Sequence, residues 1–162
     1  MWPRGGMVTQ RIANPFIPVR FWAWPPDKNT MDKEILKIAL NTQNLSYLNN
    51  HTHFAKVKNA TCGDEIKVYL KIKNGVVDNF KYEGESCIYC QASASLLSKE
   101  IKDKNVNKIN SFLNELYNFF KEGKISSDKK WKIFSKIINK KNINRKQCLL
   151  LPIKATLKAL KF

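Results

Sequence analysis

The feature that most constrains this fold is a strict alternation of apolar and polar residues along positions 66–73. The apolar positions are Ile66, Val68, Leu70 and Ile72, and the positions between them are Lys67, Tyr69, Lys71 and Lys73. A period of two residues places the apolar side chains on one face of a β-strand. A second strand pattern covers 76–83, so the sequence predicts a β-hairpin with one buried face.

The turn of this hairpin determines which side chains pair. A two-residue loop, Asn74-Gly75, would pair Val68 with Lys81 and leave the apolar faces mismatched. A three-residue loop, 73–75, pairs Val68 with Phe80 and needs a left-handed last residue, which Gly75 supplies. We therefore predict the three-residue loop. It would also pair Ile72 with Val76 and Ile66 with Tyr82.

The remaining elements follow from shorter patterns. A strand is expected at 54–58, ahead of the hairpin. Residues with a 3.6-residue apolar period predict helices, over 31–49, from about Cys87 to Ile101, from Ile109 to Gly123, over 126–138 with Ser126 or Ser127 as its cap, and over 151–160 with Pro152 near its first turn. The predicted class is α+β, a small antiparallel three-stranded sheet covered by helices, with a helical C-terminal half.

Residues 1–30 differ in composition from the rest. They hold five of the six prolines and three of the four tryptophans, but a single lysine, Lys28. We interpret this stretch as a disordered or non-native extension that precedes a start at Met31. Residues 31–162 are then expected to form one domain.

The formal charge of +16 first suggests nucleic-acid binding. However, only four of the 29 basic residues are arginine, and the lysines are spread along the whole chain. Base readout favours arginine and a clustered patch, so a nucleic-acid partner is not expected. No run approaches the roughly 20 apolar residues of a membrane span, and no secretory signal is evident. A cytoplasmic protein with no membrane partner is expected.

Three cysteines and one aspartate stand at the ends of the predicted elements. Cys62 and Asp64 precede the first hairpin strand, and Cys87 follows the second. Because both ends of a hairpin return to the same edge, these residues should lie together although 25 positions separate the two cysteines. Cys148, just ahead of the last predicted helix, could close a fourth corner.

Three thiolates and a carboxylate suit a tetrahedral zinc or a thiolate-rich iron site. An oxygen ligand is harder than a thiolate and should exchange more easily, so Asp64 is interpreted as the labile ligand. Cys87 is also expected to favour its thiolate form through the dipole of the helix that it precedes.

Simpler interpretations exist for the same residues. Asp64 after Gly63 could be a turn residue, and Cys90 could be a small core residue. Cys87 and Cys90 also have the spacing of a dithiol redox motif, although a thioredoxin-like fold needs a βαβ unit where this chain has a hairpin. The two histidines, His51 and His53, are expected to face solvent or to cap an element.

These segments resemble the NifU/IscU/SufU family of iron–sulfur cluster assembly scaffolds over roughly residues 31–160. The similar stretches are Thr61-Cys62-Gly63-Asp64, Glu83-Gly84-Glu85-Ser86-Cys87, Gln91-Ala92-Ser93-Ala94-Ser95 and Arg145-Lys146-Gln147-Cys148-Leu149-Leu150-Leu151-Pro152.

The resemblance implies a scaffold, more a carrier than an enzyme, that binds iron and a nascent 2Fe–2S cluster and passes it to apo client proteins. Cys62, Asp64, Cys87 and Cys148 match the family's ligands. A cysteine desulfurase would supply sulfur as a persulfide on either Cys62 or Cys148, and both remain open.

Two departures bear on the branch. The IscU branch has a chaperone-binding stretch and a histidine before its last cysteine, where this chain reads Asn144-Arg145-Lys146-Gln147. The 61-residue separation of Cys87 and Cys148 is more similar to the SufU branch. That similarity implies the alternative function, a zinc-bound sulfur-transfer partner of the desulfurase. Cys90 is a further departure, as an extra ligand, a redox partner or packing.

Overall fold

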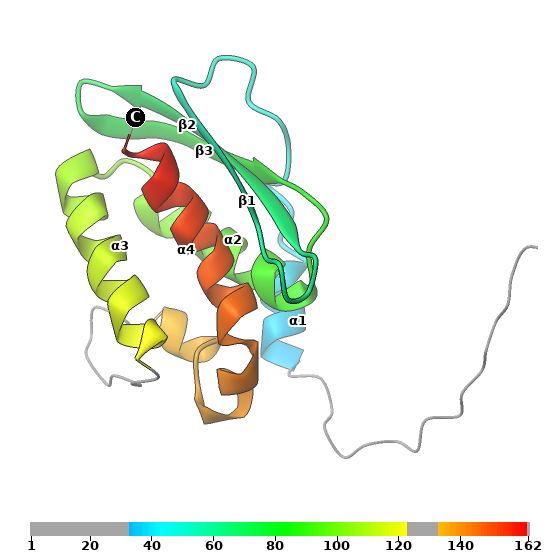
Figure 1. Ribbon diagram of the computed structural model, residues 1–162. Coiled ribbons are helices and arrows are strands. Elements are labelled where there is room, and N and C mark those ends of the chain that lie inside the picture. The colour runs from blue at the N-terminus through cyan, green and yellow to red at the C-terminus, as the bar shows by residue number, and fades with distance from the viewer. Residues whose placement is uncertain (1–32, 123–132, 162) are drawn as a thin grey trace, which may run out of the picture.

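The computed structural model describes residues 33–122 and 133–161, and it has an α+β architecture (Figure 1). A three-stranded antiparallel sheet has the order β1-β2-β3, with β2 in the centre. The predicted fold class is confirmed. The elements are β1 (His53–Lys58), β2 (Glu65–Lys73), β3 (Val76–Glu83), α1 (Lys33–Ala39), α2 (Ile88–Ile101), α3 (Val106–Lys121), α4 (Lys146–Ala159) and the 3-10 helices η2 (Phe134–Lys136) and η3 (Lys140–Arg145).

The core lies between the sheet and the helices. The alternating apolar residues of β2 point toward the helices, and Val68 and Leu70 have no exposed surface. In Figure 1, α4 lies along β1 and β2, and α2 lies along β3. α1 packs against α2, and α3 packs against α4. α4 is buried over most of its length, so the residues that it carries have fixed positions relative to the sheet.

The hairpin turn differs from the prediction. Lys73 pairs with Val76, so the loop is the two-residue Asn74-Gly75, and both loop residues have positive φ, 51° and 72°. Two positive φ values are the signature of the turn that suits the twist of a hairpin. A β-bulge then shifts the register between Lys71 and Ile72, which leaves Asp78 as the extra residue of β3.

The bulge aligns the apolar faces of the two strands, which is the reason a three-residue loop was predicted. It brings Leu70 opposite Phe80 and Val68 opposite Tyr82, so all four side chains are buried on one face. The predicted pairing of Val68 with Phe80 is therefore wrong by two residues. The predicted partners of Ile72 and Ile66 are wrong as well, since Ile72 pairs with Val77 and Tyr82 pairs with Val68. Asp78 lies outside the apolar face and forms ion pairs at 3.2 Å with Lys73 and 3.8 Å with Lys71.

The helical predictions hold in part. The predicted helix over 31–49 is too long, because α1 ends at Ala39 and residues 44–46 instead bond to β3. Ser46 N–H donates to the Tyr82 carbonyl and Tyr82 N–H donates to that of Asn44. This contact covers part of the outer edge of β3, an edge that would otherwise be free to pair with another chain.

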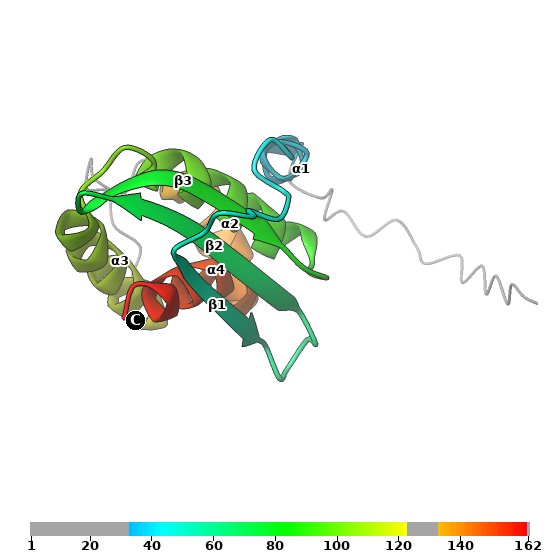
Figure 2. The ribbon, with the colours of Figure 1, turned by 90° about the horizontal axis from the view of Figure 1, so that it is seen from above.

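Residues 1–30 and 126–132, on which an extension and the start of a helix were predicted, lie outside the described residues. Two differences concern the described part of the C-terminal third. In the described part of that predicted helix, 133–138, the helical residues are Phe134–Lys136, and they are 3-10 rather than α. The last helix begins at Lys146 instead of about Leu151, so Cys148 lies within its first turn and Pro152 lies inside the helix. Figure 2, seen from above, shows α4 beneath the sheet.

The bulge yields a prediction about strand register. Deleting Asp78 should leave every apolar pair of the hairpin intact and lower the free energy of unfolding by only about 1 kcal/mol, because it removes exposed ion pairs. Deleting Lys81 should reverse the faces of Tyr82 and Glu83 and unfold the domain. Urea denaturation of the two deletions measures this contrast, and equal loss of stability in both would contradict the assigned register.

Candidate metal centre

Three potential ligands meet at one end of the hairpin. Cys62 and Asp64 lie on the loop between β1 and β2, and Cys148 lies in the first turn of α4. The ligand atoms of these three residues all lie within 4.8 Å of one another. The two sulfur atoms, Cys62 Sγ and Cys148 Sγ, are 3.8 Å apart. Zinc–sulfur bonds of about 2.3 Å in a tetrahedron place two sulfurs about 3.8 Å apart, so this separation suits one shared ion.

Asp64 links the loop to the start of α2. Its Oδ1 accepts a hydrogen bond from the backbone N–H of Cys87 at 3.1 Å. Its Oδ2 is buried and has no hydrogen-bond partner of ordinary geometry within the described ranges. A buried carboxylate oxygen without a donor is costly. A metal ion at the three ligands would satisfy it, so the residues present fit a cation.

The charge of Asp64 is consistent with a ligand. Burial by itself would raise the pKa of this carboxyl, but contacts from the Cys87 and Cys62 thiols, the Cys87 N–H and the Cys148 thiol outweigh it. The net result is a pKa below the ordinary value for aspartate. Asp64 is therefore ionised at neutral pH and can bind a cation without first losing a proton.

Cys87 lies at the border of this cluster. It is the residue before α2 with an extended backbone, as predicted, and it is half-buried. Its sulfur is not among the atoms that all lie within 4.8 Å, so three of the four predicted ligands converge fully and Cys87 adjoins them. Its thiol nevertheless contacts the Asp64 carboxylate and the Cys148 thiol.

Two thiols of the cluster, those of Cys87 and Cys148, have raised pKa values when no cation is bound. Burial raises the pKa of Cys87, and although the Cys90 N–H at the helix start lowers it, the net pKa is raised. The predicted thiolate bias of Cys87 is therefore wrong for the metal-free state. Burial also raises the pKa of Cys148, with added contributions from Cys87 and Cys62. A bound cation would reverse these shifts by displacing the protons.

The remaining cysteine and the histidines do not join the cluster. Cys90 is completely buried, and burial raises its pKa to about 12. The Nδ1 atom of His51 lies 2.7 Å from the carbonyl oxygen of Leu48. The His51 ring packs edge-on against Tyr69, on the face of the sheet away from the helices. His53 lies beside Thr52. The interpretation of Cys90 as a core residue agrees with this burial.

Two positioning residues were not singled out from sequence. Gly84 has φ +146°, and a Cβ there would lie 2.1 Å from the Glu65 carbonyl oxygen. This close approach lets Glu65 N–H bond to the Glu85 carbonyl at 2.8 Å, next to Asp64. Ser93 is completely buried and donates to the Leu149 carbonyl at 2.6 Å, which joins α2 to α4 beside Cys148.

Gly84 and Ser93 both lie in segments that the sequence analysis named, 83–87 and 91–95. A glycine three residues before a ligand indicates a tight approach of the backbone. A run of alanine and serine in a helix indicates a close helix neighbour. These patterns indicate close approaches, but the sequence does not indicate which segment lies opposite Gly84 or Ser93.

Comparison with known proteins assigns the family. The family described as NifU-like N terminal domain matches residues 30–121, more than half of the chain. The chain belongs to this family. Cys148 lies beyond the matched residues, so the structure alone brings it to the cluster.

Named relatives agree with this assignment. Residues of this chain are 40% identical over 85 positions to the iron-sulfur cluster assembly scaffold protein IscU of Thermotoga maritima, covering 49% of this chain and 60% of that protein. They are 32% identical over 88 positions to the zinc-dependent sulfurtransferase SufU of Bacillus subtilis, covering 54% and 58%. The match thus spans about three fifths of each curated relative.

Solved structures share the fold over a longer range. A NifU-like N-terminal protein of Brucella abortus superposes with a TM-score of 0.67 at 26% identity, over 80% of this chain and 90% of that one. A putative iron-sulfur cluster assembly scaffold protein for the SUF system from Fervidobacterium islandicum has the same fold, with a TM-score of 0.70 at 23% identity, over 79% and 94%. No helix in the described ranges is long and apolar enough to cross a bilayer.

The role of Gly84 can be tested by stability. Gly84→Ala should lower the free energy of unfolding by about 3 kcal/mol or more, because the new Cβ meets backbone that cannot move aside. Gly63→Ala is the matched control, since Gly63 also has positive φ, +77°, but open space around it. The control should cost only about 1–2 kcal/mol. Equal losses in urea denaturation would show that the close approach to Glu65 does not constrain the site.

Proposed function

We propose that this chain is an iron–sulfur cluster assembly scaffold that holds iron and a nascent 2Fe–2S cluster as its cargo. Cys62, Asp64, Cys87 and Cys148 would be the ligands, and the cluster would pass to apo client proteins. The observation that carries the proposal is the convergence of Cys62, Asp64 and Cys148, in which one buried oxygen of Asp64 has no hydrogen bond of ordinary geometry in the described residues. Membership of the family and the name of the Thermotoga relative support it.

Cys87 completes this ligand set in the proposal. Its thiol contacts both the Asp64 carboxylate and the Cys148 thiol. A side chain has staggered rotamers, and a change at its first torsion moves the sulfur without moving the backbone. The Cys87 backbone is held by Asp64 at 3.1 Å, so the sulfur has a fixed anchor from which to reach the ion.

The source of sulfur would be a cysteine desulfurase. Of the two candidate acceptors, Cys62 is exposed on its loop, whereas Cys148 is 5% exposed. A persulfide must be delivered by a second protein, and a buried thiol is difficult for a protein to reach. This difference favours Cys62 as the acceptor and Cys148 as a ligand that holds what is formed.

A second function is a zinc-bound sulfur-transfer partner of the desulfurase, the activity named for the Bacillus relative. The 3.8 Å sulfur separation suits zinc as well as iron. Zinc would supply a fixed charge that keeps the thiols deprotonated. In this alternative the resident ion stays in place while sulfur passes through the exposed Cys62. Under either function the protein would work in the cytoplasm.

Substitution of single cysteines tests the ligand set. Cys62→Ser, Cys87→Ser and Cys148→Ser should each lower the stoichiometry of bound metal and weaken or abolish the visible absorption of a reconstituted cluster. Cys90→Ser is the matched control and should retain both. Elemental analysis after gentle purification, followed by anaerobic reconstitution, measures the result. Stoichiometric zinc with faster desulfurase turnover favours sulfur transfer, and metal content that survives all three changes contradicts both functions.

The labile-ligand role of Asp64 is tested by two variants. Asp64→Ala removes the ligand and the acceptor of the Cys87 N–H, so it should lower the free energy of unfolding by about 1–2 kcal/mol. Asp64→Asn keeps an amide oxygen for that N–H but is a weaker ligand. Asp64→Ala should slow transfer of the cluster to an apo ferredoxin, followed by circular dichroism, because the easily exchanged oxygen ligand is lost, whereas Asp64→Asn keeps an oxygen at this position and should slow transfer less. Transfer rates equal to that of the unsubstituted protein would contradict the labile role.

A further inference from the structure

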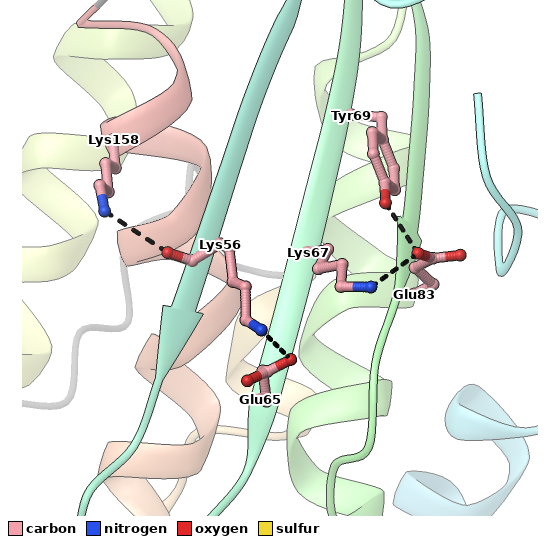
Figure 3. Close-up of polar contacts among 6 residues, drawn as sticks. All are labelled: Lys56, Glu65, Lys67, Tyr69, Glu83 and Lys158. Carbon is pink, nitrogen blue, oxygen red and sulfur yellow. Dashed lines mark hydrogen bonds and ion pairs between the residues drawn. The ribbon is translucent and has the colours of Figure 1, made fainter. Parts of the chain in front are cut away.

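The lysines on the sheet and those beside the metal centre have different surroundings. On the sheet, Lys56 pairs with Glu65 at 2.8 Å and Lys67 pairs with Glu83 at 3.2 Å (Figure 3). Tyr69 also donates to the same Glu83 carboxylate. Asp78 likewise forms ion pairs with Lys71 and Lys73, the two lysines nearest the turn. The basic charge of this face is therefore largely balanced within the protein.

The segment that carries Cys148 has no such balance. Between residues 133 and 161 there is no aspartate or glutamate at all. Among the described side chains, an ion pair joins Lys136 of this segment to Glu34 of α1 at 3.3 Å. The basic residues of the segment are Lys136, Lys140, Lys141, Arg145, Lys146, Lys154, Lys158 and Lys161.

A groove runs beside the metal centre along this segment. It has a volume of about 220 Å³, and its lining includes Lys58, Thr61, Tyr117, Gln147 and Lys154. Lys58 ends β1, and Thr61 immediately precedes the proposed ligand Cys62. Gln147 immediately precedes Cys148. Lys154 lies about 9 Å from Cys148 along the axis of α4, at the helical rise of about 1.5 Å per residue. We call this surface the basic groove.

The lining of the basic groove has a definite chemical preference. Its charged side chains are both lysines, and its other polar groups come from neutral residues. Neither Lys58 nor Lys154 forms a close ion pair in the part of the chain that the structure describes. Glu65 lies opposite Lys58 across the strands and interacts with it at longer range, but its close ion pair is with Lys56, at 2.8 Å. Their ammonium groups can therefore pair with carboxylates from outside the chain.

We propose that the basic groove binds an acidic segment of the partner protein that exchanges sulfur or cluster with the metal centre. The proposal rests on the proposed function and deepens it by stating the chemistry of the partner. The groove reaches both Thr61 and Gln147, so a segment seated there lies next to the exposed thiol of Cys62. Carboxylates in the groove would orient the partner and speed its encounter with the site.

A protein segment suits the groove better than a nucleic acid. Single-stranded nucleic acids are bound by basic residues together with aromatic side chains on which bases stack. The groove has one aromatic residue, Tyr117, and it is half-buried. The cluster of aromatic rings formed by Tyr47, Phe54 and Tyr69 lies elsewhere, on the outer face of the sheet.

The test compares two pairs of charge reversals. Lys58→Glu with Lys154→Glu alters the groove. Lys99→Glu with Lys102→Glu is the matched control, because these lysines lie at the opposite end of α2, about 20 Å from Cys87 at the helical rise. Binding of a fluorescently labelled oligoglutamate peptide and of a labelled single-stranded oligonucleotide is measured by anisotropy on the full, zinc-loaded chain at several salt concentrations.

The groove variant should bind oligoglutamate at least about tenfold more weakly, and the control should bind with little change. Affinity of the unsubstituted chain should fall with salt. Equal losses in both variants would overturn the proposal, because they would indicate a response to net charge alone. Stronger binding of the oligonucleotide than of oligoglutamate, lost in the groove variant, would also overturn it in favour of nucleic acid.

Two further measurements separate this proposal from the proposed function. Zinc affinity of the groove variant is determined by competition with a chelator, and it should match that of the control. A selective loss of zinc affinity with unchanged peptide binding would overturn the groove proposal, because the lysines would then serve only the charge of the metal centre. Cys62→Ser with Cys148→Ser should lose zinc yet bind the peptide, so failure of one proposal leaves the other standing.

Discussion

The carboxylate of Asp64 is the point on which the site depends. Its Oδ1 holds the Cys87 N–H at the start of α2, and its neighbour Glu65 bonds to the Glu85 carbonyl. These contacts fix the loop between β1 and β2 against α2, while Ser93 fixes α2 against α4. Asp64 and Ser93 together therefore fix where three cysteines lie relative to one another. The second oxygen of Asp64 has no hydrogen-bond partner of ordinary geometry in the described structure, which is the property that distinguishes a ligand from a simple helix cap.

The sheet could be predicted because alternation is a local signal. Each strand was placed to within a residue or two, since apolar side chains at every second position have one way to be buried. The turn could not be placed, because the bulge at Asp78 breaks that alternation on one strand only. Val77 and Phe80 both face the core although three positions separate them, and this spacing is the trace that the bulge leaves in the sequence. Residues 40–49 were wrongly predicted as helix, because the contact of residues 44–46 with Tyr82 is tertiary and leaves no local pattern.

For the candidate site, the sequence predicted which residues come together but not the distances between their ligand atoms. Hairpin ends meet, so the approach of Cys62 and Asp64 to Cys87 followed from strand order. That Cys148 lies 3.8 Å from Cys62 depends on how α4 packs across the sheet, which no local pattern encodes. The basic groove was hidden for a related reason. Lysines spread evenly along the sequence suggested a uniform surface, but acidic residues accompany them on the sheet and do not occur in the sequence 133–161 that contains α4.

Pro152 has a consequence for the third cysteine. A helix normally holds the carbonyl of residue 148 by the N–H of residue 152, but proline has no N–H and its ring crowds that carbonyl. The turn that carries Cys148 is thus joined to the rest of α4 by one backbone bond fewer, while Thr156 secures the turn beyond by donating to the Pro152 carbonyl at 2.9 Å. The turn that carries Cys148 therefore depends for its position on apolar packing and on the Ser93 hydroxyl more than the turns that follow it do. A change in that packing would shift the third thiol of the metal centre before it disturbed the rest of α4.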